Sequence, residues 1–225
     1  NDSLIGIAKD SWKDQSFMLY RLSEKQREKL LLPLGQKMKD EVKDFVRQCG
    51  YEEIANKRES FGLCFTNGKH YSEFLLEKYP ELKKLENGKV FNKNNQEIGT
   101  HKGYPFYTIG QYKGLNCEGK QYINKIIAEE NAIFVGEKSD CYFSTLRLNS
   151  LVFSQNIENI KLNTQYLTKI RGKDEGNFAT LREISSNHSI IEFSQRVFAP
   201  MQGQDVVVYD DNNFILFGGR IESFS

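Results

Sequence analysis

The chain has 225 residues, of which 39% are hydrophobic and 27% are charged, and its formal net charge at pH 7 is +1. This composition predicts a folded, globular protein of one large or about two to three small domains. No run of about 18 apolar residues is present, so the sequence predicts no membrane-spanning helix. The near-neutral total charge neither favours nor excludes nucleic acid, because binding depends on local patches.

The start of the chain and its cysteines bear on the cellular compartment. The opening Asn1 to Leu4 lacks both a basic start and an apolar stretch, so we expect no secretory signal. The absence of an initiator methionine leads us to expect an upstream part of the protein. The four cysteines are Cys49, Cys64, Cys117 and Cys141. None forms a C-x-x-C pair, so zinc has weak support, and we favour reduced cytosolic thiols over two disulfides.

The first third of the sequence is typical of helices. Ser23 and Gln26 form a capping box that opens a short helix, which Pro33 and Gly35 close. A second helix follows, ended by a glycine at position 50, with apolar residues at i, i+3, i+4 and i+7: Val42, Phe45, Val46 and Cys49. A third helix, from about residue 70 to 79, is expected to bury three of its side chains: Tyr71, Phe74 and Leu75.

From about residue 82 the pattern changes to strands and turns. Asn94-Asn95 and Glu129-Glu130-Asn131 are hairpin candidates, and Phe106 to Ile109 is a strand candidate. Short strands at regular spacing then predict a small sandwich or barrel over the last 80 or so residues. The expected strands are Tyr142–Phe153, Tyr166–Arg171, Phe178–Ile184, Ser189–Phe193, Asp205–Tyr209 and Phe214–Phe217.

Residues for nucleotide chemistry are not evident. The sequence has no G-x-x-x-x-G-K-[ST] loop, and Gly218-Gly219, its only double glycine, lies within a strand pattern. We therefore expect no cofactor site and no metal site on this chain. The histidines at positions 70, 101 and 188 are far apart, and a structural or surface role is favoured for each.

Several short motifs occur one after another along the chain. They are Lys13-Asp14-Gln15-Ser16, Leu19-Tyr20-Arg21-Leu22-Ser23, Pro33-Leu34-Gly35, Ser60-Phe61-Gly62-Leu63-Cys64-Phe65, Tyr107-Thr108-Ile109-Gly110-Gln111, Lys113-Gly114-Leu115, Ala199-Pro200-Met201-Gln202-Gly203-Gln204 and Phe217-Gly218-Gly219-Arg220-Ile221. Each is weak alone, but the series closely resembles the tRNA-specific 2-thiouridylases (the MnmA/TrmU family) over nearly the whole chain.

The resemblance implies an enzyme with an N-terminal ATP-pyrophosphatase domain, a small central domain and a C-terminal β-barrel. Such enzymes replace the 2-oxygen of wobble uridine 34 in certain tRNAs with sulfur. ATP, with Mg, first adenylates that oxygen; a cysteine persulfide then delivers sulfur to C2, and AMP departs. A second cysteine in the N-terminal half assists the release. The implied partners are tRNA and a sulfur-donor protein, either a persulfide relay or a cysteine desulfurase, without a membrane, in the cytoplasm.

The resemblance also implies an α+β chain in three parts. Residues 1–78 would be the helical tail of an α/β catalytic domain, residues 79–141 a small β-rich central domain and residues 142–225 an antiparallel β-barrel. The nucleotide loop and the second cysteine are absent, so we expect a C-terminal fragment that is inactive alone. The ATP site would belong to the missing N-terminal domain.

Specific residues acquire roles by the same resemblance. Cys64 matches the persulfide cysteine, the one catalytic residue expected here. The triplet Lys13, Asp14 and Gln15 matches a tRNA-contact segment. On the barrel, Arg171, Gly172 and Gln204 match positions that touch tRNA, and Arg and Gln suit phosphates and base edges.

Three departures from the family pattern bear on specificity. Gly172 stands where an aromatic residue is usual, and Tyr112 where an Arg is usual. The segment Gly119 to Tyr122 replaces one that contains Trp. Two alternatives therefore stay open beside the sulfurtransferase: an inactive RNA-binding module or paralogue of the same family, and a structural barrel that docks proteins.

Overall fold

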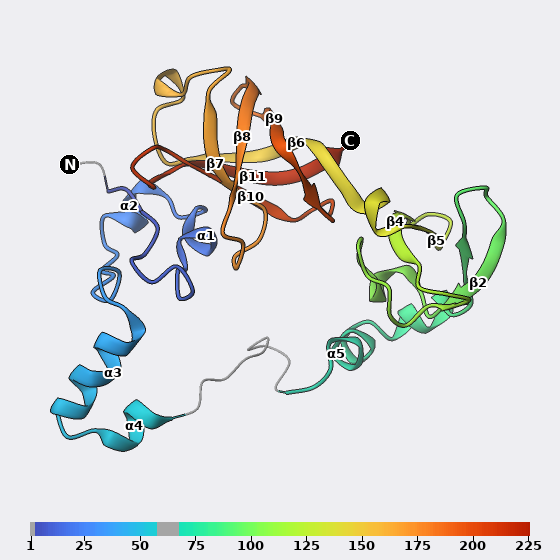
Figure 1. The fold of residues 1–225 in the computed structure, drawn as a ribbon, viewed down its shortest axis with the longest axis horizontal. Coiled ribbons are helices and arrows are strands. Elements are labelled where there is room, and N and C mark those ends of the chain that lie inside the picture. The colour runs from blue at the N-terminus through green and yellow to red at the C-terminus, as the bar shows by residue number, and fades with distance from the viewer. Residues whose placement is uncertain (1–2, 58–67) are drawn as a thin grey trace. The chain divides into compact units, whose positions relative to one another are not determined.

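The structure, a computed structural model, describes residues 3–57 and 68–225. They divide into two compact units (Figure 1). The first combines the described residues up to 57 with Phe143–Ser225, and the second takes in the described residues from 68 to Tyr142. The three-part division expected from the sequence concerns domains of the full-length protein and stays a prediction.

The N-terminal part of the first unit contains short helices. They are α1 (Ser16–Leu19), α2 (Glu24–Arg27), α3 (Lys39–Gln48) and α4 (Glu52–Asn56). The expected capping box of α2 is confirmed, since the Gln26 side chain accepts from the Ser23 backbone N–H at 2.9 Å. The helix ends at Arg27, well before Pro33, so the expected boundary was too late.

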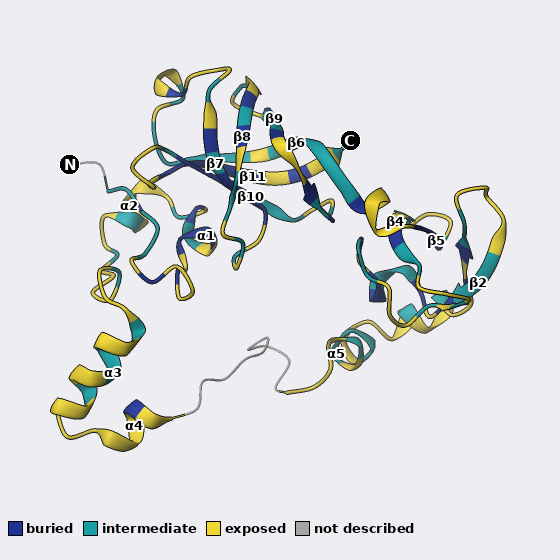
Figure 2. Cartoon of the chain, viewed as in Figure 1, coloured by how far each residue is buried: buried dark blue, intermediate teal, exposed yellow. Residues whose placement is uncertain are grey.

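Helix α3 has the apolar face that its spacing predicts, and Gly50 follows it in the left-handed region at φ +84°. None of its residues is buried, however, and Phe45 is 65% exposed. Figure 2 shows the alternation of exposed and half-buried residues along this helix. Periodicity identified the helix correctly but did not predict its burial, because it shows which residues share a face and not what covers that face.

The C-terminal part of the first unit is a closed six-stranded barrel. Its strands are β6 (Tyr142–Phe153), β7 (Gln165–Lys169), β8 (Asn177–Ile184), β9 (His188–Phe198), β10 (Asp205–Tyr209) and β11 (Ile215–Phe224). They follow one another round the barrel in the order β10-β11-β6-β9-β8-β7. The α+β class and the C-terminal antiparallel barrel predicted from the sequence are thus confirmed.

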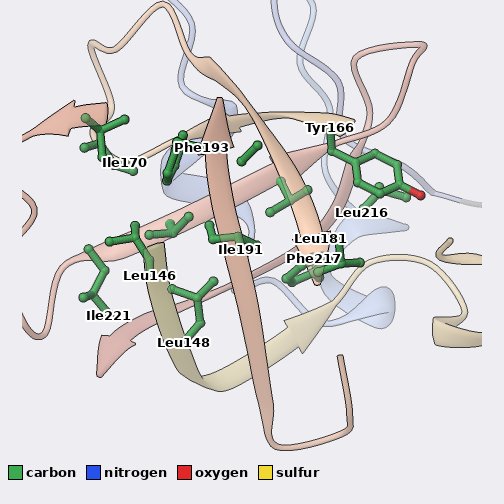
Figure 3. Close-up of a cluster of buried hydrophobic side chains, with 14 of the residues drawn as sticks. Leu146, Leu148, Tyr166, Ile170, Leu181, Ile191, Phe193, Leu216, Phe217 and Ile221 are labelled. Atoms are coloured by element: carbon green, nitrogen blue, oxygen red, sulfur yellow. The ribbon is translucent and has the colours of Figure 1, made fainter. Parts of the chain in front are cut away.

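The barrel strands serve two cores because successive side chains of a strand point to opposite faces. On β10, Val206 and Val208 belong to the interior core, whose side chains converge in Figure 3. Val207 and Tyr209 belong to a second core on the outer face of the same strand. A continuous apolar strand is therefore explained by burial on both sides.

The N-terminal segment supplies the other half of this second core. Ile5, Phe17 and Tyr20 are buried there with β10 residues and Ile215. The segment is also held by backbone contacts, since Gly6 bridges Phe214. Residues from the two ends of the chain thus form one compact unit.

The second unit contains a five-stranded sheet and short helices. Its strands are β1 (Gly88–Phe91), β2 (Glu97–His101), β3 (Asn116–Cys117), β4 (Tyr122–Ile127) and β5 (Ala132–Gly136), in the order β3-β2-β1-β5-β4. Both expected hairpins are confirmed, and their turns contain Asn95 at φ +59° and Asn131 at φ +48°. Strands β1 and β5 pair in parallel.

Two expectations for the second unit were wrong. Residues Tyr104–Phe106 form the 3₁₀ helix η3. Residues 107–109, the rest of the expected strand, are not part of any strand. Pro105, directly before the expected strand, fits a helix start better than a strand interior. Helix α5 (Tyr71–Lys78), followed by η2 (Pro80–Leu85), buries none of its residues fully. Among the described helices none is long and apolar enough to cross a membrane.

Candidate nucleic-acid interface

The candidate persulfide cysteine, Cys64, lies outside the described residues. The other three cysteines have free thiols. Cys49 is exposed at the end of α3, whereas burial raises the pKa of the Cys117 thiol and that of the Cys141 thiol. A raised pKa disfavours the thiolate that nucleophilic sulfur chemistry needs, so Cys117 and Cys141 fit a structural role.

The first candidate tRNA segment is a turn that a buried carboxylate fixes in place. The Asp14 side chain is 1% exposed and forms a 3.0 Å ion pair with Lys169 Nζ, itself 4% exposed. Asp14 Oδ1 accepts hydrogen bonds from the backbone N–H groups of Ala8 and Ser16, both at 3.1 Å. Asp14 Oδ2 accepts from the Ser16 hydroxyl at 2.8 Å.

This environment sets the charge of Asp14. Burial acts to raise the pKa of the carboxyl, but the hydrogen bonds from Ala8, Lys169 and Ser16 outweigh it and hold the pKa below its ordinary value. Asp14 therefore remains ionised and has its lone pairs occupied within the protein. Asp14 therefore anchors the turn inside the protein, while its neighbours Lys13 and Gln15 are exposed on the surface.

Lys169 is a site residue that reasoning from the sequence missed. It lies at the end of β7, and its ammonium group is 5.6 Å from the centre of the Tyr209 ring. The Tyr209 hydroxyl is 3.0 Å from the Ser16 hydroxyl, which completes the polar cluster. The signal available in the sequence was a lysine in an otherwise uncharged strand.

The second candidate segment follows β7. The guanidinium of Arg171 donates to the Phe198 carbonyl at 3.1 Å from two nitrogens, and also to the Ala199 carbonyl. The adjacent Gly172 lies against α1, since a Cβ at this position would be 3.4 Å from Met18 Cε. Gly172 therefore brings this segment next to α1, the helix that begins at Ser16.

The third candidate, Gln204, lies in the turn before β10. Its side-chain oxygen accepts from the Met201 N–H at 3.1 Å, and its backbone carbonyl accepts from the Ile221 N–H at 2.8 Å. The turn includes Gly203 at φ +83°, a conformation that favours glycine. Gln204 is thus held in the turn that leads into β10, the strand that pairs with β7 and β11.

Two motifs of the sequence meet on the outer face of the barrel. A Cβ at Gly218 would lie 2.3 Å from Cδ2 of Tyr20, so the glycine is what allows the tyrosine ring to pack. Tyr20 is 1% exposed. Gly218 therefore serves close packing with the N-terminal segment, whereas a Cβ at Gly219 would meet Leu151 and Asn149 of β6.

Trp12 is a second residue that the sequence reasoning did not single out. It is the only tryptophan of the chain, is 80% exposed and directly precedes Lys13. An exposed aromatic ring beside a cation suits stacking on an unpaired base. The combination of a lone aromatic with the Lys13–Gln15 motif was the signal available in the sequence.

The described residues do not fit a nucleoside triphosphate or a metal ion. Helices α1 to α5 begin after Gln15, Ser23, Met38, Tyr51 and His70, and none of these follows a run of glycines. Within residues 3–57 and 68–225, no group of three or more His, Cys, Asp or Glu side chains is placed to hold a metal.

Comparison with known proteins identifies two family domains. Residues 1–68 match the tRNA methyl transferase HUP domain, and residues 72–137 match the tRNA methyl transferase PRC-barrel domain. The adjoining residues 143–225 contain most of the six-stranded barrel described above. The matches together cover the motifs of the N-terminal segment and of the second unit.

Curated relatives match almost the entire chain. The tRNA-specific 2-thiouridylase MnmA of Cytophaga hutchinsonii is 30% identical over 99% of this chain and 61% of its own length. Those of Chlorobium phaeobacteroides and Natranaerobius thermophilus are each 34% identical, over 96% and 98% of this chain and 60% and 59% of their own length. The chain thus spans about 60% of the length of the curated relatives it matches. On these matches and on its fold, the chain belongs to the family of the tRNA-specific 2-thiouridylases.

Proposed function

We propose that this chain provides the sulfur-carrying cysteine and part of the tRNA-binding surface of a tRNA-uridine 2-sulfurtransferase. One observation carries the proposal. Two segments that the resemblance assigns to tRNA contact are joined by the Asp14–Lys169 ion pair, although their residues are 155 positions apart in sequence. A fold that holds both segments on one face suits a single extended ligand.

The surface chemistry of these segments suits RNA. Lys13 and Arg171 are cationic and exposed, and exposed Trp12 offers a stacking face. Arg171 donates hydrogen bonds from two guanidinium nitrogens to backbone carbonyls, and these bonds fix the plane of its guanidinium. A fixed guanidinium loses less conformational entropy when it binds a phosphate. Gln204 is oriented in the same way by its bond to Met201 and would contact a sugar or base edge.

The chemical step assigned to this chain is sulfur transfer. Cys64 carries the persulfide, whose terminal sulfur bonds to C2 of the wobble uridine while the adenylated 2-oxygen leaves with AMP. The thiol of the second cysteine, in the N-terminal half of the full-length protein, then breaks the S–S bond, which leaves a disulfide with Cys64 and the 2-thiouridine. A persulfide cysteine must be reachable by a donor protein, which would be a persulfide relay or a cysteine desulfurase. Activation of the oxygen by ATP belongs to the full-length protein, in keeping with the matched HUP domain. Such an enzyme would work in the cytoplasm, where its tRNA is found and thiols stay reduced.

The test uses the full-length protein with a cysteine desulfurase system and radiolabelled sulfur. Each of the cysteines Cys49, Cys64, Cys117 and Cys141 is changed to Ser in turn, and 2-thiouridine in tRNA is measured by mass spectrometry. We expect only Cys64→Ser to abolish both the label at these four positions and 2-thiouridine formation. Normal thiolation by the Cys64→Ser enzyme would show that another residue carries the sulfur.

The same experiment separates the alternatives when tRNA binding is measured beside it. If the wild-type protein binds tRNA but forms no 2-thiouridine, it is the inactive RNA-binding module. A protein with neither property would be the structural barrel, for which the exposed apolar face of α3 is the favourable observation. Thiolation that depends on Cys64 would exclude both.

A further inference from the structure

Two arginines from distant parts of the sequence share one carboxylate on the outer face of the barrel. Arg21 Nη2 is 2.7 Å from Asp205 Oδ1, and Arg220 Nε is 3.7 Å from the same oxygen. Asp205 begins β10 and lies opposite Arg220 in the register with β11. Arg21 comes from the segment just after α1 and reaches the same point from outside the barrel.

The register brings Arg171 toward the same place. Strands β7 and β10 pair with Val207 opposite Lys169. This is the last pair at this end of β7, so Arg171 follows two residues beyond it, while Asp205 begins β10 two residues before Val207. The next residue before Asp205 is Gln204. The segments that carry Arg171 and Gln204 thus adjoin the end of β10 at which Arg21 and Arg220 meet Asp205.

The arginines are held in place and still accessible. The guanidinium of Arg21 lies 5.0 Å from the centre of the Tyr20 ring, so stacking and the ion pair together fix its orientation. The Arg21 side chain is 38% exposed and that of Arg220 is 54% exposed. Each guanidinium has five N–H donors, and a single carboxylate oxygen cannot occupy them all. Both retain donors that face solvent.

The cluster has a net positive charge. One carboxylate, Asp205, stands against Arg21 and Arg220. The nearest acidic side chain in sequence to Arg171, Asp174, accepts hydrogen bonds from the backbone of Ile170 and Gly176 and is thus locally engaged. Fixed guanidinium groups with an excess of positive charge are suited to bidentate recognition of phosphate.

We propose that Arg21 and Arg220, oriented by Asp205, bind phosphate groups of the tRNA backbone and extend the surface marked by Arg171 and Gln204. This proposal rests on the proposed tRNA-binding function. Arg21 and Arg220 are the contacting residues, and Asp205 is a positioning residue that acts through them. The bound strand would run across the ends of β10 and β11.

The experiment measures binding of tRNA to the 225-residue chain by fluorescence anisotropy over a range of salt concentrations. Each phosphate contact adds about 0.7–0.9 to the slope of log K against log salt. We expect Arg21→Gln and Arg220→Gln each to lower the slope by about that amount, and the double variant by about twice as much. Lysine at either position should retain the slope, because the charge is kept, while weakening binding through loss of the forked donors.

Arg182→Gln is the matched control. Arg182 is on β8, three strands from β11 on either path round the closed barrel, its side chain is 47% exposed, and it forms a 2.7 Å ion pair with Glu192. It should leave the slope unchanged. Circular dichroism and urea unfolding of each variant check that the fold is intact.

The outcomes are distinguishable. If the wild-type chain binds tRNA and loses slope with Arg171→Ala but not with Arg21→Gln or Arg220→Gln, the phosphate site is wrong and the proposed function stands. If Arg182→Gln lowers the slope as much as they do, the effect is general charge and the site is again wrong. If the wild-type chain binds no tRNA at low salt, both proposals fall.

Discussion

Removing the ammonium group opposite Asp14 tests the anchor of the N-terminal segment. In Lys169→Met the buried Asp14 carboxyl group would lose its 3.0 Å partner. Deleting one partner of a buried ion pair typically costs about 3–5 kcal/mol in the free energy of unfolding. Three hydrogen bonds to Asp14 remain, from Ala8 and from the backbone and hydroxyl of Ser16, so we expect the lower end of this range.

The double variant Asp14→Asn/Lys169→Met separates charge from packing. It leaves no buried charge, and we expect it to be more stable than Lys169→Met alone. Urea unfolding gives the free energies. Hydrogen exchange of the amides of Ala8 and Ser16 reports whether the segment has detached, since both donate to Asp14 Oδ1. A loss of less than about 1 kcal/mol in Lys169→Met, the scale of a surface pair, would refute the argument.

The same carboxylate makes stability depend on pH. The pKa of Asp14 lies below its ordinary value of 3.8 in the folded chain. The unfolded chain therefore binds this proton first as pH falls, so the stabilisation is present above 3.8 and is lost as pH drops through the folded pKa. Asp14→Asn should flatten this part of the curve of unfolding free energy against pH. An identical curve in the wild type and variant would remove Asp14 from the effect.

Three further predictions concern the outer face of the barrel. Arg171→Ala should lower the slope of log K against log salt for tRNA binding by about one unit or less, as measured by anisotropy. Gly218→Ala should cost about 1–3 kcal/mol in urea unfolding, because its Cβ would lie 2.3 Å from the Tyr20 ring. Added tRNA should quench the fluorescence of Trp12, the only tryptophan, if its exposed ring stacks on a base.

Each of these has an internal check. Gly35→Ala is the control for the glycine variant, since its nearest non-neighbouring atom is 3.4 Å away, and it should cost far less. A slope that Arg171→Ala leaves unaltered would remove that residue from the interface. Trp12 emission that stays constant while anisotropy shows binding would place the indole outside the contact.

Strands were the part of the fold most accessible to prediction. Tyr142–Phe153 and Asp205–Tyr209 were predicted with the bounds observed, because alternation and turn residues delimit them locally. The burial of α3 and α5 was not predictable in the same way. An apolar face such as that of Phe45 gives the side of a helix but does not specify its partner.

For the candidate site, local motifs located segments but not their contacts. The Lys13–Ser16 motif marked a functional turn, yet nothing local indicated that Asp14 points inward to a lysine 155 residues away. Burial of an ion pair depends on tertiary packing, which a single sequence does not encode in its periodicity. The resemblance assigned Asp14, Arg171 and Gln204 to tRNA contact, and these roles stay predictions.

The outer core of the barrel constrains the order in which the protein folds during synthesis. Ile5, Phe17 and Tyr20 leave the ribosome well before Val207 and Tyr209, with which they pack. The bond between Ser16 and Tyr209 spans 193 residues, so this core closes late and carries a large loop-closure cost. In sequence, the second unit lies wholly between the two parts of the first, so it can fold before the first unit is complete. Until β10 and β11 emerge, the N-terminal segment is a candidate client for chaperones.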